Sequence, residues 1–160
     1  MEASKKIKIT DINTAMAKAE HYCAYQERSQ QEVRDKLYEW GLWPDAVENV
    51  ITGLIENNFL NEERFARAYT LGKFNQKGWG KIKIKQGLKF KRVSPALIKK
   101  SLSMIDPDNY LEKLTKILEK KAATISEKEP FKRHYKLQQY ALSRGYETDV
   151  TADVLKASNL

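Results

Sequence analysis

Residues 81–85 read Lys-Ile-Lys-Ile-Lys, and the secondary structure of this stretch decides the fold class of the chain. Strict alternation of charged and apolar residues favours a β-strand with one buried face. Elsewhere in the 160-residue chain, apolar residues recur mostly at helical spacing between four prolines and seven glycines. The local pattern and its surroundings therefore disagree, and evidence from outside the stretch has to settle the matter.

An internal repeat favours the helix. A shift of the sequence by 51 positions superimposes apolar residues and a proline, and a shift by 104 positions superimposes apolar residues and a glycine. Repeats of this length are typical of helical arrays, and they place residues 81–85 in the middle helix of a second repeat. The matched positions include Val33 with Ile84, Leu37 with Leu88 and Pro44 with Pro95 for the first shift, and Val33 with Leu137, Gly41 with Gly145 and Ile51 with Leu155 for the second.

The repeat predicts an all-α protein made of three tandem three-helix units. Capping signals agree with it, since Ser29 and Glu32 have the spacing of a capping box and Asn61 can cap a later helix. Pro44 and Pro95 suit the first turn of a helix, where a missing N–H costs nothing. The expected boundaries are a flexible segment at residues 1–13 and repeats at residues 14–57, 61–105 and 107–157.

The composition indicates a polyanionic partner. Lys and Arg number 29 against 21 Asp and Glu, which gives a net charge of +8. Such a surplus suits nucleic acid, an acidic protein face or anionic lipid. Lipid and membrane are disfavoured, because no apolar run approaches the roughly 20 residues that span a bilayer. With no signal-peptide pattern and a single cysteine, Cys23, expected as a buried structural thiol, we expect a cytoplasmic protein.

No pattern of residues predicts catalysis, a metal or a cofactor. His21 and His134 are far apart and lack metal-binding spacing. Residues 78–81 read Gly-Trp-Gly-Lys, without the spacing of a phosphate-binding loop. Acidic pairs such as Glu62 and Glu63 suit a solvated helix start better than acid–base chemistry. The sequence therefore predicts a protein that is not an enzyme.

A run of cations is the candidate binding site. Residues 73–92 contain eight Lys and Arg and no Asp or Glu. On a helix, Lys81, Lys85 and Lys89 lie along one side, where like charges repel and a polyanion would relieve the repulsion. The alternative is a solvated face that serves solubility. The candidate contacts are Lys73, Lys77, Lys81, Lys83, Lys85, Lys89, Lys91 and Arg92.

Exposed aromatic rings would add the ability to stack on bases. The tyrosines that could do so stand at helical spacing, so we expect them in the core rather than on the surface. They are Tyr22, Tyr69, Tyr135 and Tyr140.

Residues 57–66 read N-N-F-L-N-E-E-R-F-A, and an aromatic residue follows at position 69. This resembles the most recognisable segment of the RecX family of bacterial recombination regulators. Residues 28–37 and 78–88 resemble two further family stretches. One departure is Asn61, which stands where the family has an aspartate and should be tolerated as a helix cap. The matching residues, expected to be mainly structural, are Leu60, Asn61, Glu62, Arg64, Phe65, Ala66 and Tyr69.

The resemblance implies a curved, elongated array of three three-helix repeats without catalytic residues, and we expect the protein to be a monomer. It implies binding to RecA and to RecA filaments on single-stranded DNA, with inhibition of the RecA ATPase, recombinase and co-protease activities. Recombination, DNA repair and the SOS response would be the processes regulated. Weak direct binding to nucleic acid is compatible with the same surface.

Two other functions fit three-helix units. A helix-turn-helix-like protein could read duplex DNA, although the middle helices lack the Arg, Asn and Gln that read base edges. A helical scaffold for other proteins would bind with an affinity insensitive to salt.

Overall fold

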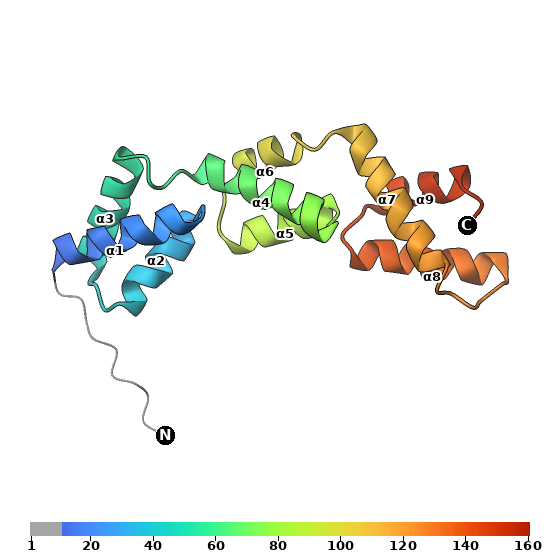
Figure 1. The fold of residues 1–160 in the computed structure, drawn as a ribbon, viewed down its shortest axis with the longest axis horizontal. Helices are drawn as coiled ribbons and strands as arrows, with labels where there is room; N and C mark the ends of the chain where they lie inside the picture. Colours follow the sequence, from blue (N-terminus) through green and yellow to red (C-terminus); the bar gives the residue numbers. More distant parts are fainter. Residues whose placement is uncertain (1–10) are drawn as a thin grey trace, which may run out of the picture. The chain divides into compact units, whose positions relative to one another are not determined.

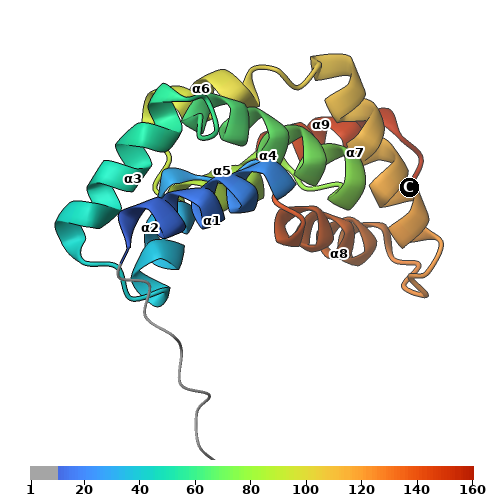
Figure 2. The same ribbon diagram turned by 60° about the vertical axis from the view of Figure 1, so that its left-hand side comes forward.

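The computed structural model describes residues 11–160, and this described part contains nine α-helices and no strand. Figure 1 draws them as coiled ribbons. The all-α prediction is confirmed. The helices follow one another along the chain from α1 to α9, an order that the colours of Figures 1 and 2 trace from blue to red. Their bounds are α1 Ile12–Tyr25, α2 Gln30–Glu39, α3 Pro44–Glu56, α4 Glu62–Lys77, α5 Lys81–Phe90, α6 Pro95–Leu102, α7 Pro107–Ala122, α8 Pro130–Ser143 and α9 Thr148–Ala157.

The expected flexible segment at residues 1–13 lies largely outside the described residues. Its last part is helical, because α1 begins at Ile12, two residues before the expected start of the first repeat. The carboxylate of Asp11 accepts hydrogen bonds from the amides of Asn13 and Thr14, at 3.2 and 3.3 Å. This cap satisfies two of the amides that the first helical turn leaves free.

The alternating stretch at residues 81–85 forms the first turn of α5. Ile84 is buried, whereas Ile82 is 41% exposed. A strand would have turned both isoleucines to the same face, and a helix separates them by about 200°. The alternation is therefore incidental, and the repeat gives the correct secondary structure.

The chain divides into two compact units. The first comprises the described residues up to Ala68 together with Lys91–Val93, and the second comprises Tyr69–Phe90 and Ser94–Leu160. The division falls within α4, so both units contribute to the expected second repeat.

The first unit is built on α1, α2 and α3. Ala15 and Ala19 are buried on α1, and their small side chains let the helix lie close to α3. Ser29 caps α2 by accepting from the Glu32 amide at 3.0 Å, while its hydroxyl donates to the Glu32 carboxylate at 3.4 Å. One half of the expected capping box is thus present, and the other half is replaced by a contact between side chains.

In the second unit, backbone hydrogen bonds join the start of α5 to the end of α8. The Gly80 amide donates to the Arg144 carbonyl at 2.8 Å, and the Ile82 amide donates to the Gly145 carbonyl at 2.9 Å. The buried Tyr146 hydroxyl donates to the Gly78 carbonyl at 2.9 Å. This junction fixes α4 and α5 against α7 and α8, which carry most of the charges considered below.

Candidate polyanion-binding surface

Charge is divided unequally between the two compact units. The second unit contains 18 Lys and Arg against 9 Asp and Glu. The described residues of the first unit contain 8 against 11. The cationic surplus of the protein therefore resides in the second unit, which is the stronger candidate for binding a polyanion.

Aromatic rings hold three of the candidate lysines. The ammonium groups of Lys73 and Lys83 lie 4.8 and 4.6 Å from the centre of a Trp79 ring. The ammonium group of Lys81 lies 4.9 Å from the ring centre of Tyr110. Cation–π contacts leave the charge in place while restricting the side chain, so less entropy is lost when an anion binds.

Three other candidates, Lys77, Lys85 and Lys89, are exposed on α4 and α5. None of them forms a salt bridge within the part of the chain that the structure describes. Their charges are therefore free to meet an external anion. Together with the three ring-held lysines, they place six of the eight predicted contacts in one compact unit.

The remaining two candidates, Lys91 and Arg92, belong to the first unit. Lys91 forms an ion pair with Glu32 at 3.7 Å, which partly neutralises its charge. Arg92 is exposed and has a φ of 59°, in the left-handed region. The positions related to it by the repeat are Gly41 and Gly145, with φ of 90° and 93°. The second repeat thus keeps an arginine where glycine would be less strained.

The residues of the RecX-like motif make structural contacts. Leu60, Phe65 and Ala66 are buried in the described part. Asn61 caps α4 by accepting from the Arg64 amide at 2.8 Å. Arg64 in turn bonds to the Glu27 carboxylate and to the carbonyls at positions 58 and 59.

Two further motif residues pack at the start and middle of α4. Glu62 accepts from the Gln30 amide at 3.1 Å, and burial raises the pKa of its carboxyl above the ordinary value. Tyr69 stands edge-on to Trp79, with ring centres 6.5 Å apart. These contacts support the structural role expected for the motif.

One expectation about the tyrosines is wrong. Tyr135 is 58% exposed on α8, whereas Tyr22, Tyr69 and Tyr140 are partly buried. The spacing of Tyr135 from Leu137 could have predicted this exposure. Leu137 faces the core, and a residue two positions away lies on the opposite side of a helix.

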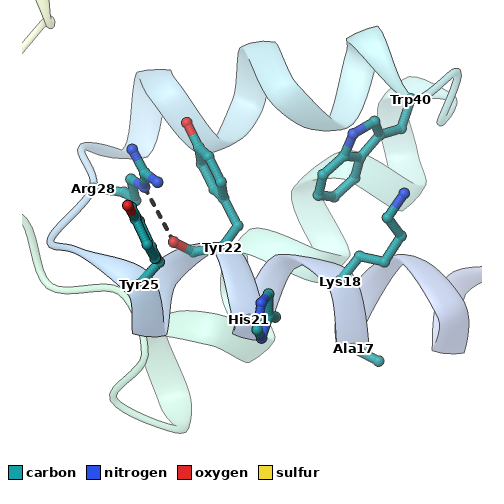
Figure 3. Close-up of a pocket in the computed structure, with 7 residues that line it drawn as sticks. All are labelled: Ala17, Lys18, His21, Tyr22, Tyr25, Arg28 and Trp40. Atoms are coloured by element: carbon teal, nitrogen blue, oxygen red, sulfur yellow. Dashed lines mark hydrogen bonds between the residues drawn. The ribbon is translucent and has the colours of Figure 1, made fainter.

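The first unit contains an aromatic groove of about 530 Å³ between α1 and α2 (Figure 3). The Arg28 guanidinium lies 3.7 Å from the ring centre of Tyr22, and its Nε donates to the Tyr22 carbonyl at 3.1 Å. At the other end, the Lys18 ammonium lies 4.7 Å from a Trp40 ring centre. Internal contacts thus engage both cations that line this groove.

Other reactive chemistry is sparse. Cys23 is buried, and burial raises the pKa of its thiol to about 11, which keeps it protonated and fits the expected structural thiol. Within residues 11–160 no group of three His, Cys, Asp or Glu side chains could hold a metal ion. None of the helices in this range combines the length and the apolar character needed to cross a membrane.

Family models for three RecX domains match the chain in order. The first three-helix domain matches residues 15–54, the second residues 61–102 and the third residues 108–155. Together these matches account for most of the chain.

Individual relatives agree with the models. Regulatory protein RecX of Clostridium perfringens (strain 13 / Type A) is 33% identical over 131 residues, which cover 81% of this chain and 61% of the relative. Regulatory protein RecX of Clostridium botulinum (strain Eklund 17B / Type B) is 34% identical with the same coverage. The chain thus spans about three fifths of the length of these curated relatives.

A solved structure agrees as well. The crystal structure of RecX from Lactobacillus salivarius superimposes with a TM-score of 0.84 and 25% identity, covering 91% of this chain and 95% of that one. With three domain models in sequence order, curated relatives and a shared fold, the chain belongs to the RecX family of regulatory proteins.

Proposed function

We propose that this protein is a negative regulator of RecA, which binds RecA or its filament on single-stranded DNA and inhibits the ATPase, recombinase and co-protease activities. Family membership supports the choice of RecA as partner. The single observation that carries the mode of binding is the charge of the second unit, with 18 Lys and Arg against 9 Asp and Glu. A nucleoprotein filament presents phosphates and acidic protein surface to such a unit.

The six candidate lysines of α4 and α5 fall into two groups. Lys73, Lys81 and Lys83 are held by aromatic rings, so they offer charge at fixed places. Lys77, Lys85 and Lys89 offer charges without internal partners among the described residues. If all six meet phosphates, affinity should fall by roughly 10³-fold or more between 50 and 200 mM salt.

Inhibition would follow from occupancy of the filament. A bound regulator can obstruct the subunit rearrangements that ATP turnover requires, or it can cap filament growth. The two mechanisms differ in stoichiometry. One regulator for each RecA protomer would indicate coating of the filament, and inhibition at much lower ratios would indicate action at its ends.

The test is the RecA ATPase on single-stranded DNA, with and without this protein. The variant Lys85→Glu/Lys89→Glu should lose inhibition, since both side chains are exposed and unpaired among the described residues. The matched control is Lys99→Glu/Lys156→Glu, which makes the same change in net charge at exposed positions on α6 and α9 and should still inhibit. Full inhibition by the first variant, at unchanged helicity, would refute the proposal. A footprint on one duplex sequence would instead favour the helix-turn-helix alternative.

A further inference from the structure

Two adjoining hollows lie between α7 and α8 in the second unit. Lys121 and Thr124 line both of them, so the hollows form one continuous groove, here called the α7/α8 groove. Their volumes are about 410 and 420 Å³. The groove lies within the third family domain, outside the run of lysines on α4 and α5.

The groove is cationic throughout. Lys120, Lys121 and Arg144 line the first hollow, and Lys121 and Lys136 line the second. The lining of both hollows includes no Asp or Glu. Charges of one sign on facing walls focus the field into the space between them, so the groove should attract anions.

Arg144 has an incompletely satisfied guanidinium. Its Nη2 donates to the Lys77 carbonyl, but its Nε is buried and has no hydrogen-bond partner within the described residues. A buried donor without a partner is costly, and it leaves the positive charge of Arg144 incompletely compensated at the wall of the groove. The bond to the Lys77 carbonyl also places this end of the groove against the end of α4.

Aromatic rings accompany the cations. Tyr135 lines the second hollow and is 58% exposed, and Tyr140 lines the first with the Lys121 ammonium 4.7 Å from its ring centre. An acidic protein surface needs only the charges, whereas an accessible ring between lysines is the arrangement on which unpaired bases stack. The combination therefore favours a single nucleic-acid strand over an acidic protein.

We propose that the α7/α8 groove binds single-stranded nucleic acid directly. Lys120, Lys121, Lys136 and Arg144 contact phosphates, and Tyr135 stacks on a base. The site makes the third repeat a nucleic-acid-binding element without any contribution from RecA. It extends the function proposed above without resting on it.

The test is fluorescence anisotropy of a labelled oligo-dT of about 20 nucleotides, titrated with the full chain in the absence of RecA. Lys121→Gln/Lys136→Gln should raise Kd about tenfold or more and lower the slope of log K against log salt by about 1.4. Tyr135→Leu, which keeps the charge, should raise Kd about fivefold or more with the salt slope unchanged. The matched control Lys99→Gln/Lys156→Gln should stay within about twofold of the parent.

Several outcomes would overturn the inference. Equal weakening by the control pair would mean that affinity follows net charge rather than the groove. Normal binding of the oligonucleotide by Tyr135→Leu would show that Tyr135 does not stack on a base. Polyglutamate or the matching duplex competing as well as the oligonucleotide would identify a different anion. Thermal melting checks that every variant is folded, and because RecA is absent, failure here leaves the RecA proposal standing.

Discussion

Gly80 lies where two backbone segments meet, and an alanine at this position should unfold the second unit more easily. An ideal Cβ on Gly80 would lie 2.3 Å from the Gly145 carbonyl oxygen and 2.5 Å from the Tyr146 nitrogen. Both are backbone atoms, so they cannot move aside as a flexible side chain would. The Gly80 and Ile82 amides also donate across this junction.

The size of the effect follows from these contacts. Forcing a methyl group into a packed site costs about 1–3 kcal/mol, and each weakened hydrogen bond adds about 0.5–1.5 kcal/mol. We therefore expect Gly80→Ala to lower the free energy of unfolding by about 2–6 kcal/mol. The matched control is Gly72→Ala in α4, where a Cβ would meet nothing within 4 Å. That substitution should stabilise the protein by about 0.5–1 kcal/mol, because alanine loses less backbone entropy in a helix.

Urea unfolding followed by circular dichroism measures both changes. The same Gly-to-Ala substitution should thus change the free energy of unfolding in opposite directions at two positions eight residues apart. If Gly80→Ala proved as stable as the parent, the close approach between α5 and the end of α8 would be incorrect. If Gly72→Ala destabilised the protein to a similar degree, the loss at Gly80 could not be assigned to the junction.

Two further predictions concern single residues of the first unit. Burial raises the pKa of the Cys23 thiol from 9.0 to about 11, so its thiolate fraction at pH 8 should be about a hundredfold lower than that of a free thiol. Ellman's reagent should therefore label Cys23 only when urea unfolds the protein. Prompt labelling of the folded protein would contradict the burial of this thiol. Arg92→Gly should raise the free energy of unfolding by about 0.5–1 kcal/mol, because glycine tolerates a φ of 59°. Arg92→Lys should leave stability unchanged, and a less stable glycine variant in a melting experiment would count against strain at this position.

Most of the fold could be predicted from the helical periodicity of the apolar residues and from the internal repeat. They give the helix at residues 81–85 against the local alternation, and the residue types at Ser29 and Asn61 give two of the helix caps. These features depend on neighbours in the chain, whose identity the sequence states directly. The repeat also pairs Arg92 with two glycines, which in hindsight signals its left-handed backbone.

The site was less predictable, because its chemistry depends on contacts between distant residues. Nothing local shows that Lys91 pairs with Glu32, or that Trp79 holds both Lys73 and Lys83. The charge run therefore overstated the number of equivalent cations. It also drew attention away from α7 and α8, whose cations are interrupted along the chain yet gather around one groove.

The junction at Gly80 fixes helices of different repeats within one compact unit. Hydrogen bonds from Gly80, Ile82 and Tyr146 fix α5 to the end of α8 within one compact unit. A charge is useful to a rigid partner only if its position relative to the next charge is also fixed, since otherwise binding must order it. On the binding modes proposed above, the glycines that let the backbones approach would contribute to recognition without touching the partner, because the junction fixes Arg144, at one end of the groove, against the end of α4.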